Sequence, residues 1–73
     1  MKILLNGQGH EIGSPLTVTE LLVSLDLSGK PVVVELDETA VFPRDYPQTM
    51  VGEGARVEIV ALAAILNRKI VKS

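Results

Sequence analysis

This 73-residue sequence contains a single histidine, His10, the side-chain type most often used as a general acid or base. It stands beside Glu11 on a predicted strand, and no nucleophile signature surrounds it. The sequence contains no cysteine, which excludes disulfides and thiolate metal sites, and one histidine cannot build a closed zinc site. We therefore predict no catalytic residue, no metal site, no cofactor and no enzymatic activity, and interpret His10 as an exposed strand residue.

Two other groups of residues suggest chemistry and are better explained as turns. Asp37 and Glu38 are adjacent carboxylates between two predicted strands, where short polar side chains favour a turn. The glycine pairs Gly7/Gly9 and Gly52/Gly54 lack the strand-to-helix context and the following Lys-Ser or Lys-Thr of a phosphate-binding loop. We interpret all of them as turn residues.

Arg44 in the segment Val-Phe-Pro-Arg-Asp-Tyr is a weak candidate for partner binding. Pro43 fixes the chain direction, and the five-donor guanidinium follows a strand end, where it could meet a carboxylate of a partner. The alternative is a surface arginine that covers Tyr46 or pairs with Asp45. Both interpretations stay open at the level of the sequence.

The charge is unevenly distributed along the chain. Residues 1–66 hold four Lys or Arg against nine Asp or Glu, whereas residues 67–73 add three positive charges. An acidic body disfavours nucleic acid and suits a partner with a basic docking face, although a solvated acidic surface is equally consistent. No apolar run is long enough to span a membrane, and the polar turn after residue 5 argues against a signal peptide, so we expect a cytoplasmic protein.

The first half of the chain predicts a hairpin followed by a helix. Alternation over Met1 to Asn6 and the Asn-Gly turn signal predict a strand that pairs with a second strand, roughly Gln8 to Ile12. Thr17 and Glu20 have the spacing of a capping box. An apolar stripe at helical spacing follows, which indicates a core-facing helix: Val18, Leu21, Leu22 and Leu25.

The second half predicts a second hairpin and a final strand. Residues 32–36 and 39–42 are β-branched or apolar strands around a turn, residues 43–51 are irregular or form one helical turn, and residues 56–60 form the last strand. We expect an α+β fold of the ubiquitin-like β-grasp type: a mixed sheet of four to five strands with one helix packed on one face. The last strand is expected to lie centrally beside the first, since residues 57–66 are apolar on both faces.

The order and spacing of these segments resemble those of the thiamine-pathway sulfur carrier proteins, the ThiS family, over residues 1–64. The resemblance is carried by the opening strand with its Asn-Gly turn, the capped helix start at 16–22, the strand at 32–36 with 41–44, and residues 52–60. It implies a carrier whose C-terminal glycine carboxylate is activated by an E1-like adenylyltransferase (ThiF-type). The carboxylate then becomes a thiocarboxylate, which delivers sulfur to a thiazole synthase (ThiG-type).

The chain departs from the family at its end. The resemblance places the terminal Gly-Gly at Ile65 and Leu66, and seven residues follow. We therefore divide the chain into a domain, residues 1–64, and a C-terminal extension, residues 65–73. By the same resemblance Ala63, Ala64, Ile65 and Leu66 are the candidate partner-binding residues.

Three functions remain open for such a chain. The first is a sulfur carrier of the family, and the second is a non-carrier interaction module that self-associates through its tail. The third is a carrier whose tail was altered by readthrough or at a fusion boundary. Apolar spacing in residues 61–71 is compatible with either helix or strand and adds apolar surface for a partner or a second copy.

Overall fold

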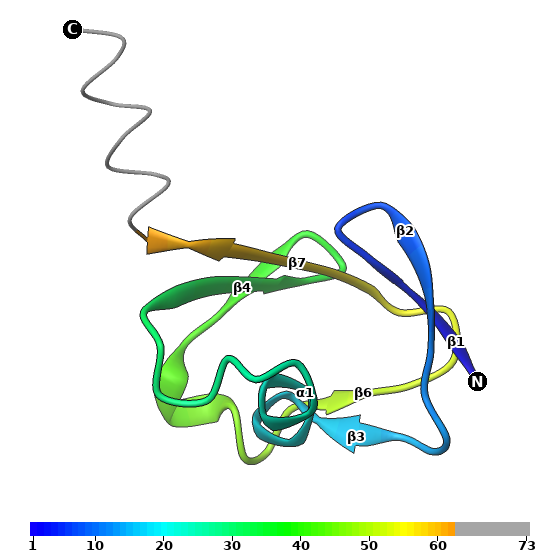
Figure 1. The fold of residues 1–73 in the computed structure, drawn as a ribbon, viewed down its shortest axis with the longest axis horizontal. Coiled ribbons are helices and arrows are strands. Elements are labelled where there is room, and N and C mark those ends of the chain that lie inside the picture. Colours follow the sequence, from blue (N-terminus) through cyan, green and yellow to red (C-terminus); the bar gives the residue numbers. More distant parts are fainter. Residues whose placement is uncertain (63–73) are drawn as a thin grey trace, which may run out of the picture.

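The computed structural model describes residues 1–62, and Figure 1 shows their arrangement. Seven strands, one α-helix and one 3₁₀ turn are present in this part of the chain. In chain order they are β1 (Lys2–Leu5), β2 (Gln8–Glu11), β3 (Leu16–Thr17), α1 (Val18–Ser24), β4 (Val32–Leu36), β5 (Thr39–Val41), η1 (Pro43–Asp45), β6 (Met50–Val51) and β7 (Arg56–Ala61).

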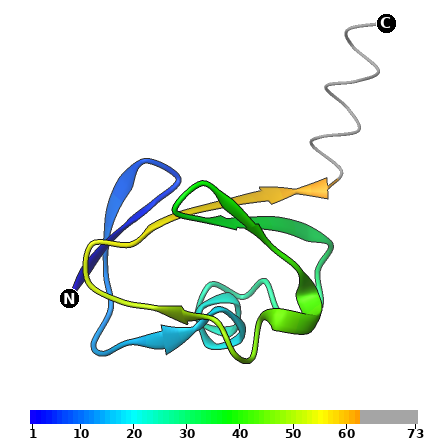
Figure 2. The same ribbon diagram turned by 180° about the vertical axis from the view of Figure 1, so that it is seen from behind.

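The main sheet has the strand order β2-β1-β7-β4-β5. The two hairpins are antiparallel, β7 is antiparallel to β4, and β7 is parallel to β1. The last strand therefore lies centrally, beside the first, as the sequence predicts. Figures 1 and 2 show from opposite sides that α1 and the small β3–β6 sheet lie together against one face of this main sheet.

Helix α1 begins where its capping box predicts. The Thr17 hydroxyl accepts from the Glu20 N–H at 3.1 Å, and the Glu20 carboxylate accepts from the Thr17 N–H at 2.8 Å. Two of the unpaired donors at the helix start are thus satisfied locally. The helix ends after two turns, with Leu25 as its C-cap and Asp26 at φ +60°.

The core lies between α1 and the covered face of the main sheet. It is entirely aliphatic, and no buried side chain in the described part of the chain is polar. In β7 the buried residues alternate along the strand, and in α1 they form one stripe, as the periodicity of each element predicts. The buried set is Ile3, Ile12, Val18, Leu21, Leu22, Val34, Val51, Val57 and Ile59.

The structure also contains a feature that the sequence does not predict. Leu16–Thr17 and Met50–Val51 pair as a two-stranded sheet, and the backbone N–H of Val18 donates to the Thr49 carbonyl at 2.9 Å. The sequence pattern indicates a helix start and a loop at these positions, because two residues carry no alternation. Pro43–Asp45 forms one 3₁₀ turn, which is one of the two alternatives that the sequence leaves open for residues 43–51. The β-grasp prediction is confirmed.

Candidate partner-binding face

The main sheet has one covered face and one open face. Along β7, Val57 and Ile59 point to the core while Arg56 and Glu58 are exposed, and Val60 is half-buried. Within residues 1–62 no element lies over the outward side of the sheet (Figures 1 and 2). We use the term open face for the residues on that side: Lys2, Leu4, Gly9, Glu11, Val33, Glu35, Ala40, Arg56, Glu58 and Val60.

Side chains on the open face are arranged in rows across the strands. Val33 stands opposite Val60, and in the next row Glu35 stands opposite Glu58. Like charges directly opposite each other on neighbouring strands destabilise a sheet. Among the described residues neither carboxylate forms a salt bridge. The open face thus presents an apolar row beside a pair of carboxylates that attracts cationic groups.

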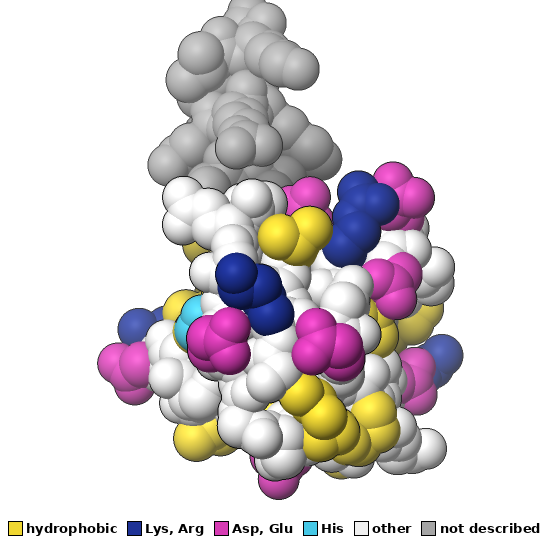
Figure 3. Space-filling view, turned by 90° about the vertical axis from the view of Figure 1, so that its right-hand side faces the viewer, with side chains coloured by type: hydrophobic (Ala, Val, Ile, Leu, Met, Phe, Trp, Pro, Cys, Tyr) yellow, Lys and Arg dark blue, Asp and Glu magenta, His cyan; other side chains and the backbone are white. Residues whose placement is uncertain are grey.

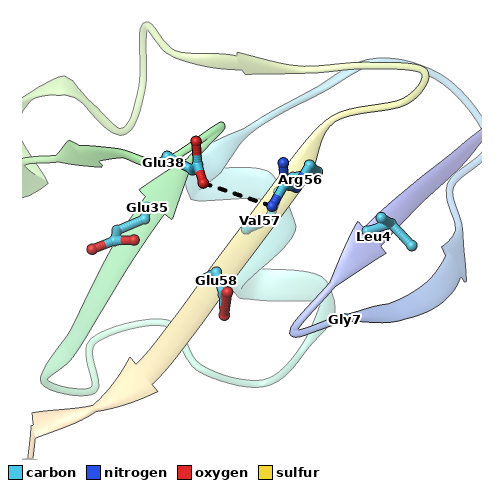
Figure 4. Close-up of a pocket in the computed structure, with 7 residues that line it drawn as sticks. All are labelled: Leu4, Gly7, Glu35, Glu38, Arg56, Val57 and Glu58. Atoms are coloured by element: carbon cyan, nitrogen blue, oxygen red, sulfur yellow. Dashed lines mark ion pairs between the residues drawn. The ribbon is translucent and has the colours of Figure 1, made fainter.

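A shallow hollow of about 240 Å³ lies on this face. Figure 4 shows the residues that line it, with α1 on the far side of the sheet. The Arg56 guanidinium reaches across it to the Glu38 carboxylate at 3.8 Å. Both side chains are largely exposed, 61% and 79%, so solvent screens the pair and it holds neither residue firmly. The hollow is suited to a side chain of a partner protein and offers no enclosed space for a small substrate.

Arg44 lies at the margin of the sheet on η1. Its guanidinium carbon lies 5.6 Å from the centre of the Phe42 ring, and its Nε lies 4.0 Å from an oxygen of Asp45. The pairing with Asp45 is therefore present, while the ring that the arginine covers is Phe42 and not Tyr46. Phe42 is itself 58% exposed, so this cation–π pair lies at the surface.

A second hollow, of about 390 Å³, lies away from the carboxylate pair, against the end of α1. Its lining is mainly apolar and includes Leu22, Leu27, Pro31 and Tyr46. Burial raises the pKa of the Tyr46 phenol, because desolvation disfavours the charged form. No set of converging acids and bases among the described residues lines this hollow, so it offers no catalytic arrangement.

His10 lies on β2, as predicted, but its side chain is half-buried rather than exposed. It stands opposite Ile3, whose side chain points to the core, so the ring shares the covered face at the edge of the sheet. Between residues 1 and 62 no group of three or more His, Asp or Glu is placed to hold a metal ion.

The predicted carboxylate turn at Asp37 and Glu38 is confirmed, and Gly7 and Gly54 are turn residues as predicted. The prediction is wrong for Gly9, which lies within β2 because it pairs with Leu4 across the hairpin. Asp37 and Glu38 have φ angles of +50° and +70°, and Gly7 and Gly54 also adopt positive φ, which glycine does without a Cβ clash. Asp37 does more than make a turn, because its carboxylate accepts from the Arg56 N–H at 2.9 Å. No local signal in the sequence points to this contact, which joins residues 19 positions apart.

Asn6 is a second residue with a role beyond its turn. The sequence indicates only the Asn-Gly turn, yet the side-chain amide of Asn6 makes two hydrogen bonds to Ile59. A residue that combines a turn conformation with a free amide can replace a missing strand partner, but nothing local in the sequence identifies which strand it meets. The Asn6 amide meets β7 because β1 and β7 are neighbours in the sheet.

Positive and negative side chains are interspersed at the end of the molecule that carries β1 and β2, as Figure 3 shows. No continuous basic surface for nucleic acid is seen on this side of residues 1–62, in line with the charge distribution of the sequence. In the region that the structure describes, every helix is too short or too polar to cross a bilayer.

The predicted tail residues Ala63, Ala64, Ile65 and Leu66 lie outside the described residues. The described chain leaves the sheet just before them. Leu62 follows β7 directly, and its backbone N–H donates to the Pro31 carbonyl at 3.0 Å.

The fold and sequence of this chain are similar to those of known proteins. The chain resembles a thiamine biosynthesis protein (ThiS) from Geobacter metallireducens, with a TM-score of 0.79 and 29% identity over 85% of this chain and 94% of that crystallised chain. A solution structure of a thiamine biosynthesis protein from the same organism gives a TM-score of 0.72 and 30% identity, covering 82% and 81% of the two chains.

A curated relative, a thiazole synthase from Paramagnetospirillum magneticum (strain ATCC 700264 / AMB-1), is 34% identical over 61 residues, which is 84% of this chain. The chain spans only 19% of the length of that relative. The family model of the ThiS family matches residues 3–64. The match covers most of the chain, including all strands of the main sheet and the helix, and the chain therefore belongs to the ThiS family.

Proposed function

We propose that this ThiS-family chain acts as a sulfur-carrier-like protein of thiamine biosynthesis, binding partner enzymes rather than catalysing a reaction itself. The observation that carries the proposal is the family match over residues 3–64 in a fold whose central strand leads directly to the family's terminal positions. The comparisons do not favour the alternative of a non-carrier interaction module. Residues 1–64 are the carrier domain in this proposal, and residues 65–73 are an extension of it.

The open face is the docking surface in this proposal. Its apolar row, Val33 with Val60, excludes water from a partner, and the carboxylates of Glu35 and Glu58 select a partner with basic side chains. Arg44, on η1, is a separate and weaker candidate contact, because its side chain is 82% exposed and available to a carboxylate.

Two partners are proposed. The first is an E1-like adenylyltransferase, which would activate the terminal carboxylate with ATP, and the second is a thiazole synthase, which would receive the sulfur. Support for the second comes from the curated relative, a thiazole synthase that contains a stretch similar to this chain. Because activation consumes ATP, the proposal places the chain in the cytoplasm.

The proposal is tested by incubating the chain with ATP, a ThiF-type adenylyltransferase and a sulfur donor, followed by intact-mass measurement. The matched variant carries Ile65→Gly and Leu66→Gly and ends at residue 66. We expect exchange of one oxygen for sulfur in the variant, because glycine without Cβ threads a narrow channel, and slower exchange in the chain as it stands, where Ile65 and Leu66 are bulkier. Failure of both forms would contradict carrier function and favour the interaction module.

Self-association through residues 65–73 is a separate proposal, supported by the apolar residues at helical spacing in that segment. Light scattering over a concentration series compares the full chain with a chain ending at Ala64. A mass that rises with concentration only for the full chain supports it, and two monomers contradict it.

A further inference from the structure

β7 has neighbours of unequal length on its two sides. On one side β4 pairs with it from Val57 to Ala61. On the other side β1 pairs only with Arg56 and Val57, because the chain turns away at Asn6 and Gly7 with φ angles of +51° and +83°. Figure 4 shows this turn lying beside β7. Beyond Val57, the β1 side of the strand has no backbone strand partner among the described residues.

The next backbone groups on that side belong to Ile59, since the N–H and C=O of a strand residue point the same way and alternate along the strand. Both are satisfied by one side chain. The Ile59 N–H donates to the Asn6 Oδ1 at 2.7 Å, and the Asn6 Nδ2 donates to the Ile59 carbonyl at 3.1 Å. The Asn6 backbone N–H meanwhile donates to the Val57 carbonyl at 2.8 Å.

Asn6 therefore replaces one further residue of β1. Only an amide offers a donor and an acceptor side by side in the geometry of a peptide group, so Asn can bind both groups of Ile59 and Asp cannot. Both bonds are partly buried, and their loss would leave two backbone groups near the core without partners.

Asp37 makes a related but weaker contact at the opposite end of β7. Asp37 also has positive φ. Its carboxylate accepts a hydrogen bond from the Arg56 backbone N–H, and its own backbone N–H donates to the Arg56 carbonyl at 2.7 Å. This contact is exposed and lies at the start of the strand. The two residues fix opposite ends of β7, and only Asn6 lies near the end that leads out of the sheet.

We infer that Asn6 is a positioning residue: its amide fixes the last part of β7 and so sets the direction in which the C-terminal segment leaves the sheet toward a partner's active site. The inference about the segment rests on the proposed function, whereas the fixing of β7 stands independently of it. Asn6 touches no reacting atom and acts through Ile59.

The first experiment measures amide hydrogen exchange and backbone order parameters of the full chain by NMR. Asn6→Gly removes the amide while tolerating the positive φ, and Asn6→Asp keeps the acceptor but removes the donor. We expect exchange at Ile59 to become about tenfold faster in Asn6→Gly, the size of one net hydrogen bond, with lower order parameters at Ala61 and Leu62. Core amides of Val34 and Leu21 should speed up much less than Ile59, because they respond only to the change in global stability.

Asp37→Gly is the matched control. It should speed exchange at Arg56 and leave Ile59 and Leu62 as they are. Unchanged exchange at Ile59 in Asn6→Gly would overturn the inference. An equal increase at Ile59, Val34 and Leu21 would also overturn it, because that pattern reports a loss of global stability and no local positioning.

The second experiment uses the chain with Ile65→Gly and Leu66→Gly that ends at residue 66. Adding Asn6→Gly should lower kcat for thiocarboxylate formation severalfold at nearly unchanged KM, because docking through the open face is preserved while the terminus is less well positioned. A rise in KM alone would contradict positioning. If the parent variant forms no thiocarboxylate, the proposed function fails, and the exchange experiment still decides whether Asn6 holds β7.

Discussion

The two faces of the main sheet are built from alternate residues of the same strands and differ in almost every physical property. Val34 is fully buried against α1, and its neighbour Val33 is 36% exposed on the open face. The covered face is aliphatic throughout its buried part, while the open face sets two carboxylates directly opposite each other. Folding stability is therefore concentrated on one face, and the other carries an arrangement of charges that costs some stability.

The sharpest test of this contrast compares one substitution on the two sides of the sheet. Leu21→Ala removes a fully buried side chain of α1 and should lower the free energy of unfolding by about 2–5 kcal/mol. Leu4→Ala removes the same atoms from the open face, where the side chain is 43% exposed, and should cost less than about 1 kcal/mol. Denaturant midpoints at constant m-value measure both, and similar losses would contradict the division between faces.

The helix cap provides a smaller effect on the covered side. Thr17→Ala removes the hydroxyl that accepts from the Glu20 N–H and should lower stability by about 0.5–2 kcal/mol. Thr19→Ala, on an exposed position of the same helix, should change it by less than about 0.5 kcal/mol. Thermal unfolding followed by circular dichroism distinguishes the two. A loss in Thr19→Ala as large as that in Thr17→Ala would show that the cap is unimportant.

A substitution in the carboxylate pair of the open face should raise stability, unlike the substitutions above. Glu58→Lys replaces repulsion with attraction to Glu35 and should raise stability by about 0.2–1 kcal/mol, an effect that salt reduces. The same variant should bind a basic partner more weakly, which titration calorimetry with the adenylyltransferase measures. Glu11→Lys has the same charge change but loses the attraction to the N-terminal amine 3.8 Å away, so it should not stabilise. If both Glu58→Lys and Glu11→Lys stabilised the protein, the change in net charge would explain the effect and the pairing with Glu35 would not.

The smallest expected effect appears only at alkaline pH and comes from the covered side. Burial raises the pKa of Tyr46 above its value of 10.0 in the unfolded chain, so the folded state retains the proton to higher pH. Stability should be unaffected by this group below pH 10.0 and should fall as pH rises from there through the folded-state pKa.

The measurement is favourable because Tyr46 is the only tyrosine and the chain has no tryptophan. Ultraviolet absorbance of the tyrosinate gives the folded-state titration directly, and Tyr46→Phe should reduce the alkaline loss of stability. A Tyr46 that titrates at or below 10.0 would contradict the assigned burial.

Much of the covered face follows from the sequence because its signals are local. The stripe of Val18, Leu21 and Leu22, the capping box and the alternation in β7 each need only a few neighbouring residues to be recognised. The short β3–β6 sheet has no such signal, since two-residue strands carry no periodicity. The half-burial of His10 has none either, because it depends on pairing with Ile3 across the hairpin.

The arrangement of the open face is even harder to predict from local sequence signals. Glu35 and Glu58 are ordinary surface residues in the sequence, and only the antiparallel register of β4 and β7 sets them opposite each other. Arg44 is recognisable as a surface arginine, yet its contact with Phe42 in place of Tyr46 depends on the turn at η1.

By itself, the sequence determined the type of each long element, the aliphatic core and the lack of thiolate chemistry. These depend on residue type and on spacing within one turn or one strand. Tertiary structure alone decided that Asn6 holds Ile59 and that Asp37 holds Arg56. Those contacts join residues far apart in the chain, and they exist only because β7 lies between β1 and β4.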